Sequence, residues 1–312
     1  WYEAGKIYSI DPVSIATSYH WIVPSDATII SGQGTTSITV DFGTEPGNIS
    51  VRAESGCGNS NYTDLAISIN TCGTVTGYDG NEYSTIVIGD QCWMAENLKS
   101  THYADGTPLV EGSGAGNISG DYTTKYYFWY DDDSATYAQG FGALYTWAAV
   151  MNGTTGCNGA DCDSASGAEC ITPVQGICPD GWHVPSHHEW TVLEKQVEGE
   201  NDNFPCDEAS AHSYYGEDAG GNLKETGTSH WSSPNYGATN SSGFTARGGG
   251  NRHYDGVFST IMERACFWTS TESTSSNAWR RHLSCDNDEV YRDPVDKAVG
   301  RSVRCLRDKN SK

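Results

Sequence analysis

The chain has 312 residues, 37% of them hydrophobic, and its 40 Asp and Glu against 18 Lys and Arg give a net charge of −22. This acidity argues against nucleic acid and anionic membranes as partners, because both require a basic protein surface. The length allows two domains, and the hydrophobic content, with 11% aromatic residues, suffices for packed cores and excludes a disordered chain. The acidity is typical of solubility in an extracellular medium, with calcium binding as an alternative explanation.

Alternating apolar residues predict an all-β immunoglobulin-like sandwich over residues 1–71. In the strand expected at 37–42, Ile38, Val40 and Phe42 share one face. Trp21 lies in the middle of another strand, as the core tryptophan of such a sandwich does. Six strands are expected in all, at residues 6–11, 18–23, 27–30, 37–42, 48–53 and 64–69.

Three stretches of this segment carry a resemblance to known modules. They are residues 16–24 (ATSYHWIVP), 31–34 (SGQG) and 38–43 (ITVDFG). The segment resembles the PKD-like, immunoglobulin-like domains of Bacteroidetes surface proteins over nearly its whole length. The resemblance implies an extracellular or cell-surface location.

The sandwich is expected to lack one strand. A seven-stranded immunoglobulin-like sandwich needs a strand before residues 6–11, and only residues 1–5 precede that run. An exposed edge can accept a strand from another chain, so Trp1, Tyr2 and the strand after them are predicted to contact a neighbouring copy. The alternatives are a smaller sandwich, or a first strand that has been trimmed off.

Cysteine is abundant in this chain, with eleven residues and no C-x-x-C spacing. Disulfides in an oxidising compartment explain this pattern better than zinc or redox catalysis. The odd number leaves one thiol unpaired or bridged to another chain. Residues 71–77 form a short linker, where a bridge between Cys57 and Cys72 is predicted to close the sandwich. The disulfide candidates are Cys57, Cys72, Cys92, Cys157, Cys162, Cys170, Cys178, Cys206, Cys266, Cys285 and Cys305.

Residues 72–312 are predicted to form a second, disulfide-rich α+β domain. Asp79-Gly80 lies between two extended runs, which indicates a hairpin. A short helix is expected over residues 142–151. A longer helix is expected over residues 186–197, where Ser186 and Glu189 have the spacing of a capping box.

A run of five aromatic residues at 126–130 is the predicted contact surface of this domain. Side chains on an extended strand alternate between its two faces, so about half of the run should be exposed. Tyr127 and Trp129 are therefore predicted to contact a protein or a glycan. For most of the other tryptophans, core packing is the favoured interpretation.

Eight motifs are spread along the second domain. They are residues 91–99 (QCWMAENLK), 181–186 (GWHVPS), 220–227 (GGNLKETG), 230–235 (HWSSPN), 237–244 (GATNSSGF), 267–272 (FWTSTE), 277–279 (NAW) and 302–308 (SVRCLRD). With these motifs, the domain resembles one known family, the Fibrobacter succinogenes major paralogous domain. The resemblance implies a C-type-lectin-like α+β fold on a bacterial exported protein, without established enzyme chemistry.

The segment 182–190 and the chain's final motif also resemble formylglycine-generating enzymes. However, the paired active-site cysteines of those enzymes have no counterpart here, so no activity is carried over.

No recognised catalytic or metal-binding signature is present. His183, His187 and His188 lack the His-Glu-x-x-His spacing of zinc proteases. The acidic runs 131–133 and 286–289 lack the alternating ligands of an EF-hand, so solvated loops are favoured over calcium sites. The chain contains neither a G-x-S-x-G elbow nor a nucleotide-binding glycine loop. The sequence therefore predicts a protein that is not an enzyme and has no cofactor.

Two serines are predicted to carry glycans. Ser134 and Ser164 each lie in an Asp-Ser-Ala triplet. This triplet matches the acceptor pattern of Bacteroidetes O-glycosylation, which makes both serines candidate modification sites.

These features together predict a non-enzymatic structural or adhesive subunit of a bacterial surface. It would polymerise into a filament by strand addition between copies of itself. The alternative is a carbohydrate-binding module of a larger secreted polysaccharide-handling protein, with glycans as partners. No run approaches the roughly 20 apolar residues of a membrane-spanning helix.

Overall fold

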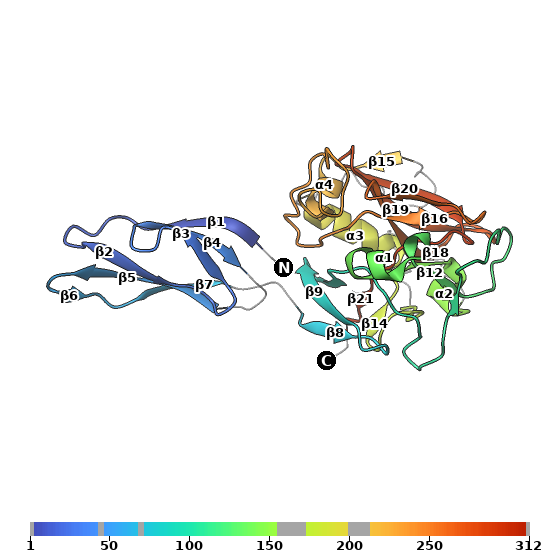
Figure 1. The fold of residues 1–312 in the computed structure, drawn as a ribbon, viewed down its shortest axis with the longest axis horizontal. Coiled ribbons are helices and arrows are strands. Elements are labelled where there is room, and N and C mark those ends of the chain that lie inside the picture. Colours follow the sequence, from blue (N-terminus) through green and yellow to red (C-terminus); the bar gives the residue numbers. More distant parts are fainter. Residues whose placement is uncertain (1–2, 43–46, 68–71, 155–172, 199–212, 310–312) are drawn as a thin grey trace, which may run out of the picture. The chain divides into compact units, whose positions relative to one another are not determined.

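The computed structural model describes residues 3–42, 47–67, 72–154, 173–198 and 213–309. The chain divides into two compact units, Trp1–Asn70 and Thr71–Lys312. Figure 1 draws both units with the chain coloured from blue to red. Trp1, Tyr2, Ser164, Cys157, Cys162, Cys170 and Cys206 lie outside the described residues.

The first unit is a sandwich of two antiparallel sheets. One sheet has the strand order β1-β4-β3, and the other has β2 beside β5, which in turn pairs with both β6 and β7. All six expected strands are present, and the short β6 is additional. The strands are β1 (Glu3–Ser9), β2 (Ser18–Ile22), β3 (Thr28–Ser31), β4 (Ser37–Phe42), β5 (Gly47–Ser55), β6 (Gly58–Asn59) and β7 (Thr63–Ile67).

The core of the sandwich follows the alternation in the sequence. Ile38, Val40 and Phe42 of β4 are at most 3% exposed, while the residues between them face outward. Trp21 of β2 is buried against them, as expected for the core tryptophan. Because the side-chain period of a strand is two, this pattern fixes the register of the β1–β4 pair.

The second unit contains two larger sheets. One has the order β14-β21-β10-β9-β8, which joins strands from both ends of the unit, and the other has the order β15-β20-β19-β18. Their strands are β8 (Thr74–Thr76), β9 (Glu82–Ile88), β10 (Gln91–Met94), β14 (Trp182–His183), β15 (Ser213–Tyr215), β18 (Arg264–Glu272), β19 (Asn277–Ser284), β20 (Val290–Asp296) and β21 (Leu306–Arg307).

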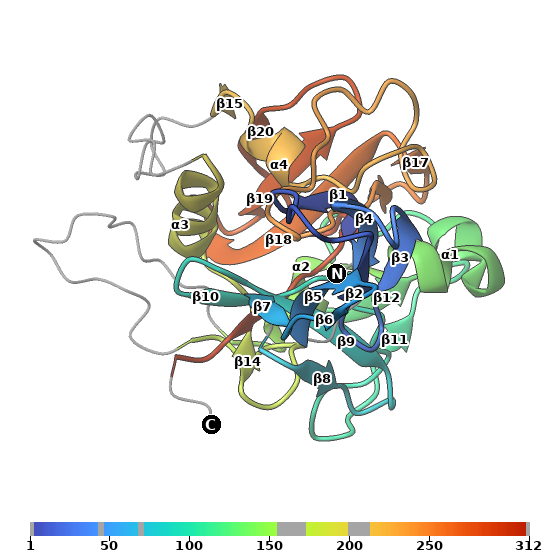
Figure 2. The ribbon, with the colours of Figure 1, turned by 90° about the vertical axis from the view of Figure 1, so that its left-hand side faces the viewer.

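Small sheets and short helices complete this unit, in which strands outnumber helices. Figure 2 shows β18, β19 and β20 side by side, with α3 lying near them. None of the described helices has the length and apolarity needed to cross a membrane. The remaining elements are β11 (Val110–Glu111), β12 (Tyr126–Phe128), β13 (Leu144–Tyr145), β16 (Gly249–Arg252), β17 (Phe258–Ile261), η1 (Tyr130–Asp132), α1 (Ser134–Phe141), α2 (Trp147–Met151), α3 (His187–Val197) and α4 (Ala219–Leu223).

Two local predictions for this unit are confirmed. The turn at Asp79-Gly80 joins the antiparallel strands β8 and β9. Helix α3 begins at His187, directly after Ser186, whose hydroxyl accepts from Glu189 N while the Glu189 carboxylate accepts from Ser186 N. This reciprocal capping box satisfies two backbone donors that the first helical turn would otherwise leave without partners.

The prediction of a helix over residues 142–151 is wrong for the first half of that range. Gly142 has φ 75°, and a Cβ there would lie 2.7 Å from both Asn97 Cβ and Leu98 O. The backbone therefore leaves the helical path, and Ala143 N donates to Leu98 O instead. Only Trp147–Met151 are helical.

The disulfides correct one prediction. Cys72 bonds to Cys92 rather than to Cys57, which is exposed and free in the turn between β5 and β6. A second bridge joins Cys178, in the loop before β14, to Cys305, directly before β21, at one edge of the five-stranded sheet. Cys266 and Cys285 are also free thiols.

Candidate functional site

Among the described residues, one side of the sandwich lacks a strand of the immunoglobulin arrangement. In the constant-type immunoglobulin arrangement, strands A, B, E and D form one sheet, strands C, F and G form the other, and the core tryptophan lies on strand C. Trp21 identifies β2 as strand C. The sheet β2-β5-β7 then corresponds to C-F-G, and β1-β4-β3 corresponds to B-E-D. Strand A therefore has no counterpart in the described residues, and β1 forms the border of its sheet.

The opposite border of the sandwich is covered. Gln33 accepts from Trp21 N at 3.0 Å and donates to Trp21 O at 2.9 Å, so its side-chain amide replaces a neighbouring strand. Tyr19 N also donates to Gly34 O. The covering segment follows β3, so β2 and β3 lie on the same side of the sandwich. β1 and β7 consequently border the other side, called the open side below.

Apolar residues are uncovered on the open side. Leu65 of β7 lies directly opposite Ile49 of β5, so both side chains point to the inner face of their sheet. Ile49 is 2% exposed, whereas Leu65 is 53% exposed. Ile7 of β1, which points to the outer face opposite Thr39, is 72% exposed. The open side therefore has an inner position that no described residue fills.

The backbone of β1 presents hydrogen-bonding groups along this border. Ile10, just after β1, donates its N–H to Thr36 O. Backbone groups on a strand alternate in direction, so the N–H and C=O groups of Ile7 and Ser9 point away from β4. These groups have the geometry that an added antiparallel or parallel strand requires.

In the second unit, residues from distant motifs meet in one buried polar network. Arg304 donates to Asn97 Oδ1 at 2.8 Å, and its other nitrogens donate to the carbonyls of Met94, Phe244 and Thr245. The guanidinium is fully buried, and this burial lowers the pKa of Arg304 to about 9. Hydrogen bonds of Arg304 thus connect the motifs at residues 91–99, 237–244 and 302–308.

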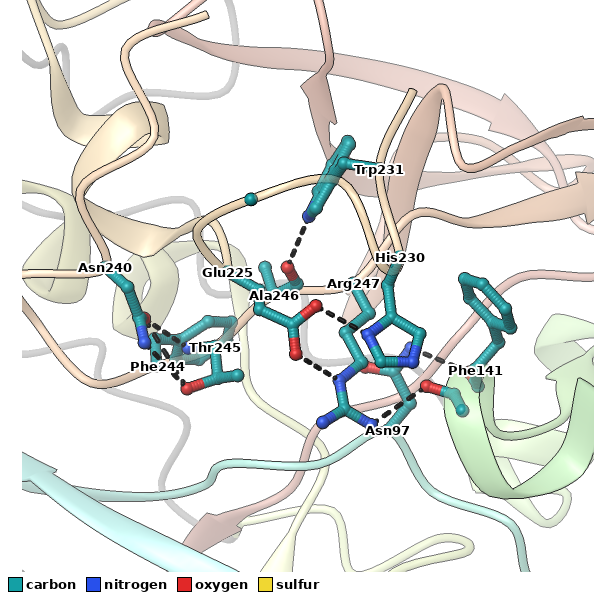
Figure 3. A network of polar contacts seen from close by, with 12 residues as sticks. Asn97, Phe141, Glu225, His230, Trp231, Asn240, Phe244, Thr245, Ala246 and Arg247 are labelled. Atoms are coloured by element: carbon teal, nitrogen blue, oxygen red, sulfur yellow. Dashed lines mark hydrogen bonds and ion pairs between the residues drawn. The ribbon is translucent and has the colours of Figure 1, made fainter. Parts of the chain in front are cut away.

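Figure 3 shows a second part of this network, around Glu225. Its carboxylate accepts from His230 Nδ1 at 2.6 Å and from Arg247 Nε at 3.0 Å. Burial acts to raise the pKa of Glu225, but the hydrogen bond from His230 and the charge of Arg247 outweigh it and lower the pKa. The His230 ring packs edge-on against Phe141, and its Nε2 lies close to Gly140. This packing favours a structural role for the ion pair over general-base catalysis.

His183 is held between two carboxylates. Its Nδ1 lies 2.6 Å from Asp308 Oδ1, and its Nε2 lies 2.9 Å from Glu189 Oε1. Burial acts to lower the pKa of His183, but hydrogen bonds and charge from Glu189 and Asp308 outweigh it and raise the pKa. Both ring nitrogens are occupied by these contacts, so the ring joins α3 to the end of β21.

A fully buried charge cluster fixes α3 to the neighbouring sheet. Glu194 of α3 accepts from Arg281 of β19 and from Arg292 of β20, and all three side chains are 0% exposed. Arg281 also lies 3.0 Å from His187 Nδ1. Burial, followed by the charges of Arg281 and Arg292, holds the pKa of His187 well below its usual value. Sequence reasoning missed this cluster, although Glu194 follows Trp190 by four residues on the buried face of the helix.

The predicted aromatic contact surface is wrong for Tyr127. Residues Tyr126–Phe128 form β12, which lies between β11 and β13, and both Tyr127 and Phe128 belong to buried hydrophobic clusters. Tyr127 is 8% exposed and packs edge-on against the partly buried Trp129. A strand between two others in a covered sheet buries both faces, so alternation does not expose half of the run.

Ser134 is exposed at the first position of α1. The preceding Asp133 caps this helix by accepting from Thr136 N. The serine is therefore accessible to a modifying enzyme, and its glycosylation stays a prediction.

Comparison with known families assigns both units. A family model of the Fibrobacter succinogenes major domain matches residues 86–307, and a model of a PKD-like domain matches residues 2–67. No curated protein and no solved structure matches the chain.

Proposed function

The chain belongs to the Fibrobacter succinogenes major domain family and begins with a PKD-like domain, and from this premise we propose that it is a structural subunit of a bacterial surface filament. Its PKD-like domain joins a neighbouring copy by strand addition, and its larger, lectin-like α+β domain decorates the assembly and adheres to surfaces. The protein acts outside the cell and has no enzymatic activity.

The open side of the sandwich carries this proposal. A strand added at β1 occupies the position of strand A and extends the β1-β4-β3 sheet over Leu65 of β7. The added strand removes apolar surface from water and pairs with the outward groups of Ile7 and Ser9. If the donated strand comes from a surface of the subunit other than the open side, repetition of this contact leads to an open chain of copies.

An extracellular location is supported by the disulfides. The bridge Cys72–Cys92 holds β10, which contains Cys92. The bridge Cys178–Cys305 holds the segment directly before β21. Such bonds form and persist in oxidising compartments.

The proposed absence of catalysis rests on the hydrogen bonds that the motif residues make within the protein. Asn97 and Arg304 bond to each other, and His183 is occupied by Glu189 and Asp308. Each of these residues joins separate segments of the chain, and this structural role explains its presence without catalysis. A catalytic group instead needs an atom directed at a substrate.

Electron microscopy of the concentrated protein tests this proposal. We expect filaments for the natural sequence and for Ser9→Ala, and dispersed particles for Ser9→Pro. Proline removes the outward N–H of Ser9, which β4 does not use, and edge strands tolerate the φ that its ring fixes, so the subunit itself should stay folded. Thermal unfolding within about 3 °C for the two variants checks this point. Dispersed particles for the natural sequence at every concentration, or filaments formed by Ser9→Pro, would overturn the proposal.

A further inference from the structure

The larger unit contains a surface pocket that the proposed assembly does not use. Its volume is about 240 Å³, and it is lined by three segments that are distant in sequence. The turn after Tyr103, the C-terminal end of α2 and the loop before β14 each contribute. The lining residues that matter to the argument are Tyr103, Asp105, Asn152, Gln175 and Asp180.

The polar side chains of this pocket are fixed in position from within the protein. Lys125 Nζ donates to Asn152 Oδ1 at 2.6 Å, which orients the amide and leaves its two N–H groups as donors. Gln175 Nε2 donates to Asp180 Oδ1 at 3.0 Å, which leaves Gln175 Oε1 and the second Asp180 oxygen as acceptors. Asp105 Oδ1 accepts from Thr107 N at 2.9 Å in the same way.

The composition of the lining restricts the ligand. Two carboxylates in the lining disfavour an anion, and the ammonium of Lys125, which donates to the lining residue Asn152, disfavours a metal cation. An apolar ligand would leave the donors and acceptors without partners. Neighbouring hydroxyl groups suit the site best, because each hydroxyl donates one hydrogen bond and accepts up to two.

We propose that this pocket binds a neutral sugar residue of a glycan. Asp105 and Asp180 accept hydrogen bonds from sugar hydroxyls, and the Asn152 amide donates to a ring or hydroxyl oxygen. Tyr103 also lines the pocket, and its hydroxyl is already bonded to Ala149 O. Fixed side chains lose little conformational entropy on binding, which favours recognition by a few hydrogen bonds. This site is separate from β1, so it gives the lectin-like unit a binding role that is independent of assembly.

A glycan array followed by calorimetry tests this site. The whole chain is applied to an array of neutral and acidic saccharides, and the affinity for the best neutral saccharide is measured. Asp180→Asn keeps the bond from Gln175 but removes the charge, and Asn152→Asp keeps the bond from Lys125 but removes the amide donors. We expect each to weaken binding at least about tenfold, and the distant Asp131→Asn to leave it unchanged.

Three results would overturn the proposal. They are the absence of any saturable neutral hit, a hit that both pocket variants retain at full affinity, and binding that EDTA abolishes. The last result would indicate a cation-mediated site. Thermal unfolding of each variant close to that of the natural sequence excludes misfolding as the cause of lost binding. Filament formation is scored separately on the same samples, so a failure here leaves the assembly test intact.

Discussion

Leu65 lies directly opposite Ile49 across the β5–β7 pair, yet Leu65 is 53% exposed and Ile49 is 2% exposed. Two side chains on the same inner face of one sheet thus experience different surroundings. The other sheet covers Ile49 of β5 but leaves Leu65 of β7 half exposed, although Ile67 at the end of β7 is partly buried against the core. The difference marks the position in which a further strand would pack.

The first prediction concerns these two residues. Leu65→Ser should lower the free energy of unfolding of the isolated subunit by less than about 1 kcal/mol, because the leucine is already half exposed. Ile49→Ala should lower it by about 2–5 kcal/mol, because it leaves a cavity in the core. Urea unfolding of dilute protein measures both values. Equal losses for the two variants would show that Leu65 is covered in the subunit.

The same leucine should matter to assembly. If an added strand covers Leu65, Leu65→Ser should raise the concentration needed for assembly about fivefold. Light scattering over a concentration series measures this shift, with the outward-facing Thr39→Ser as the control. An unchanged assembly concentration would show that Leu65 takes no part in the proposed contact.

A third prediction concerns the buried cluster around Glu194. Glu194→Gln should lower the free energy of unfolding of the larger unit by about 3–5 kcal/mol, because the guanidinium groups of Arg281 and Arg292 lose their counter-charge in a dry environment. Glu217→Gln, at an exposed position, should change it by less than about 0.5 kcal/mol. A loss below about 1 kcal/mol for Glu194→Gln, measured by urea unfolding, would contradict the structural role given to this cluster.

A fourth prediction concerns pH and His282 of β19. Burial, then the charges of Arg280, Arg264 and Arg301, lower the pKa of His282 to about 2, whereas an unfolded histidine titrates near 6.5. Below pH 6.5 the unfolded chain therefore binds a proton that the folded chain does not. This histidine should reduce stability by about 1.4 kcal/mol for each unit that the pH falls below 6.5.

The matched variant for this effect is His282→Phe, which keeps an aromatic ring beside Tyr214 and Tyr291. Its unfolding free energy should fall less steeply between pH 6.5 and 5 than that of the natural sequence. His183 affects the pH dependence of stability in the opposite way, because its pKa is raised. Its contribution to stability is complete below pH 6.5 and is lost as the pH rises above that value. Identical slopes for the variant and the natural chain would contradict the burial of a neutral His282.

Local patterns predicted the sandwich well. The period-two alternation of Ile38, Val40 and Phe42 located β4 to the residue, because one face of that strand is buried and the other is not. The capping box at Ser186 and Glu189 located the start of α3 for the same kind of reason, since its hydrogen bonds join residues three apart. Such signals are contained within a single element.

Features that depend on distant contacts were not predictable in this way. Gly142 ends a helix because Asn97 and Leu98, more than forty residues away, occupy the adjacent space. Tyr127 is buried because residues from distant segments form a core cluster around its side chain, with Trp129 packed against it. The partner of Cys72 is set by the position of β10 beside β9, which no cysteine spacing reveals. The pocket at Asn152 likewise gathers three segments that have no common motif.

Hydrogen exchange at the backbone amides of Ile7 and Ser9 tests the central claim most directly. Strand addition predicts fast exchange at both amides in dilute, dispersed subunits and strong protection after assembly, while Tyr8, on the β4 side, is protected in both states. Protection of Ile7 and Ser9 already in the dispersed subunit would mean that the same polypeptide covers this border. Fast exchange at both amides in the assembled material would show that no strand is added there, and either result would contradict the account.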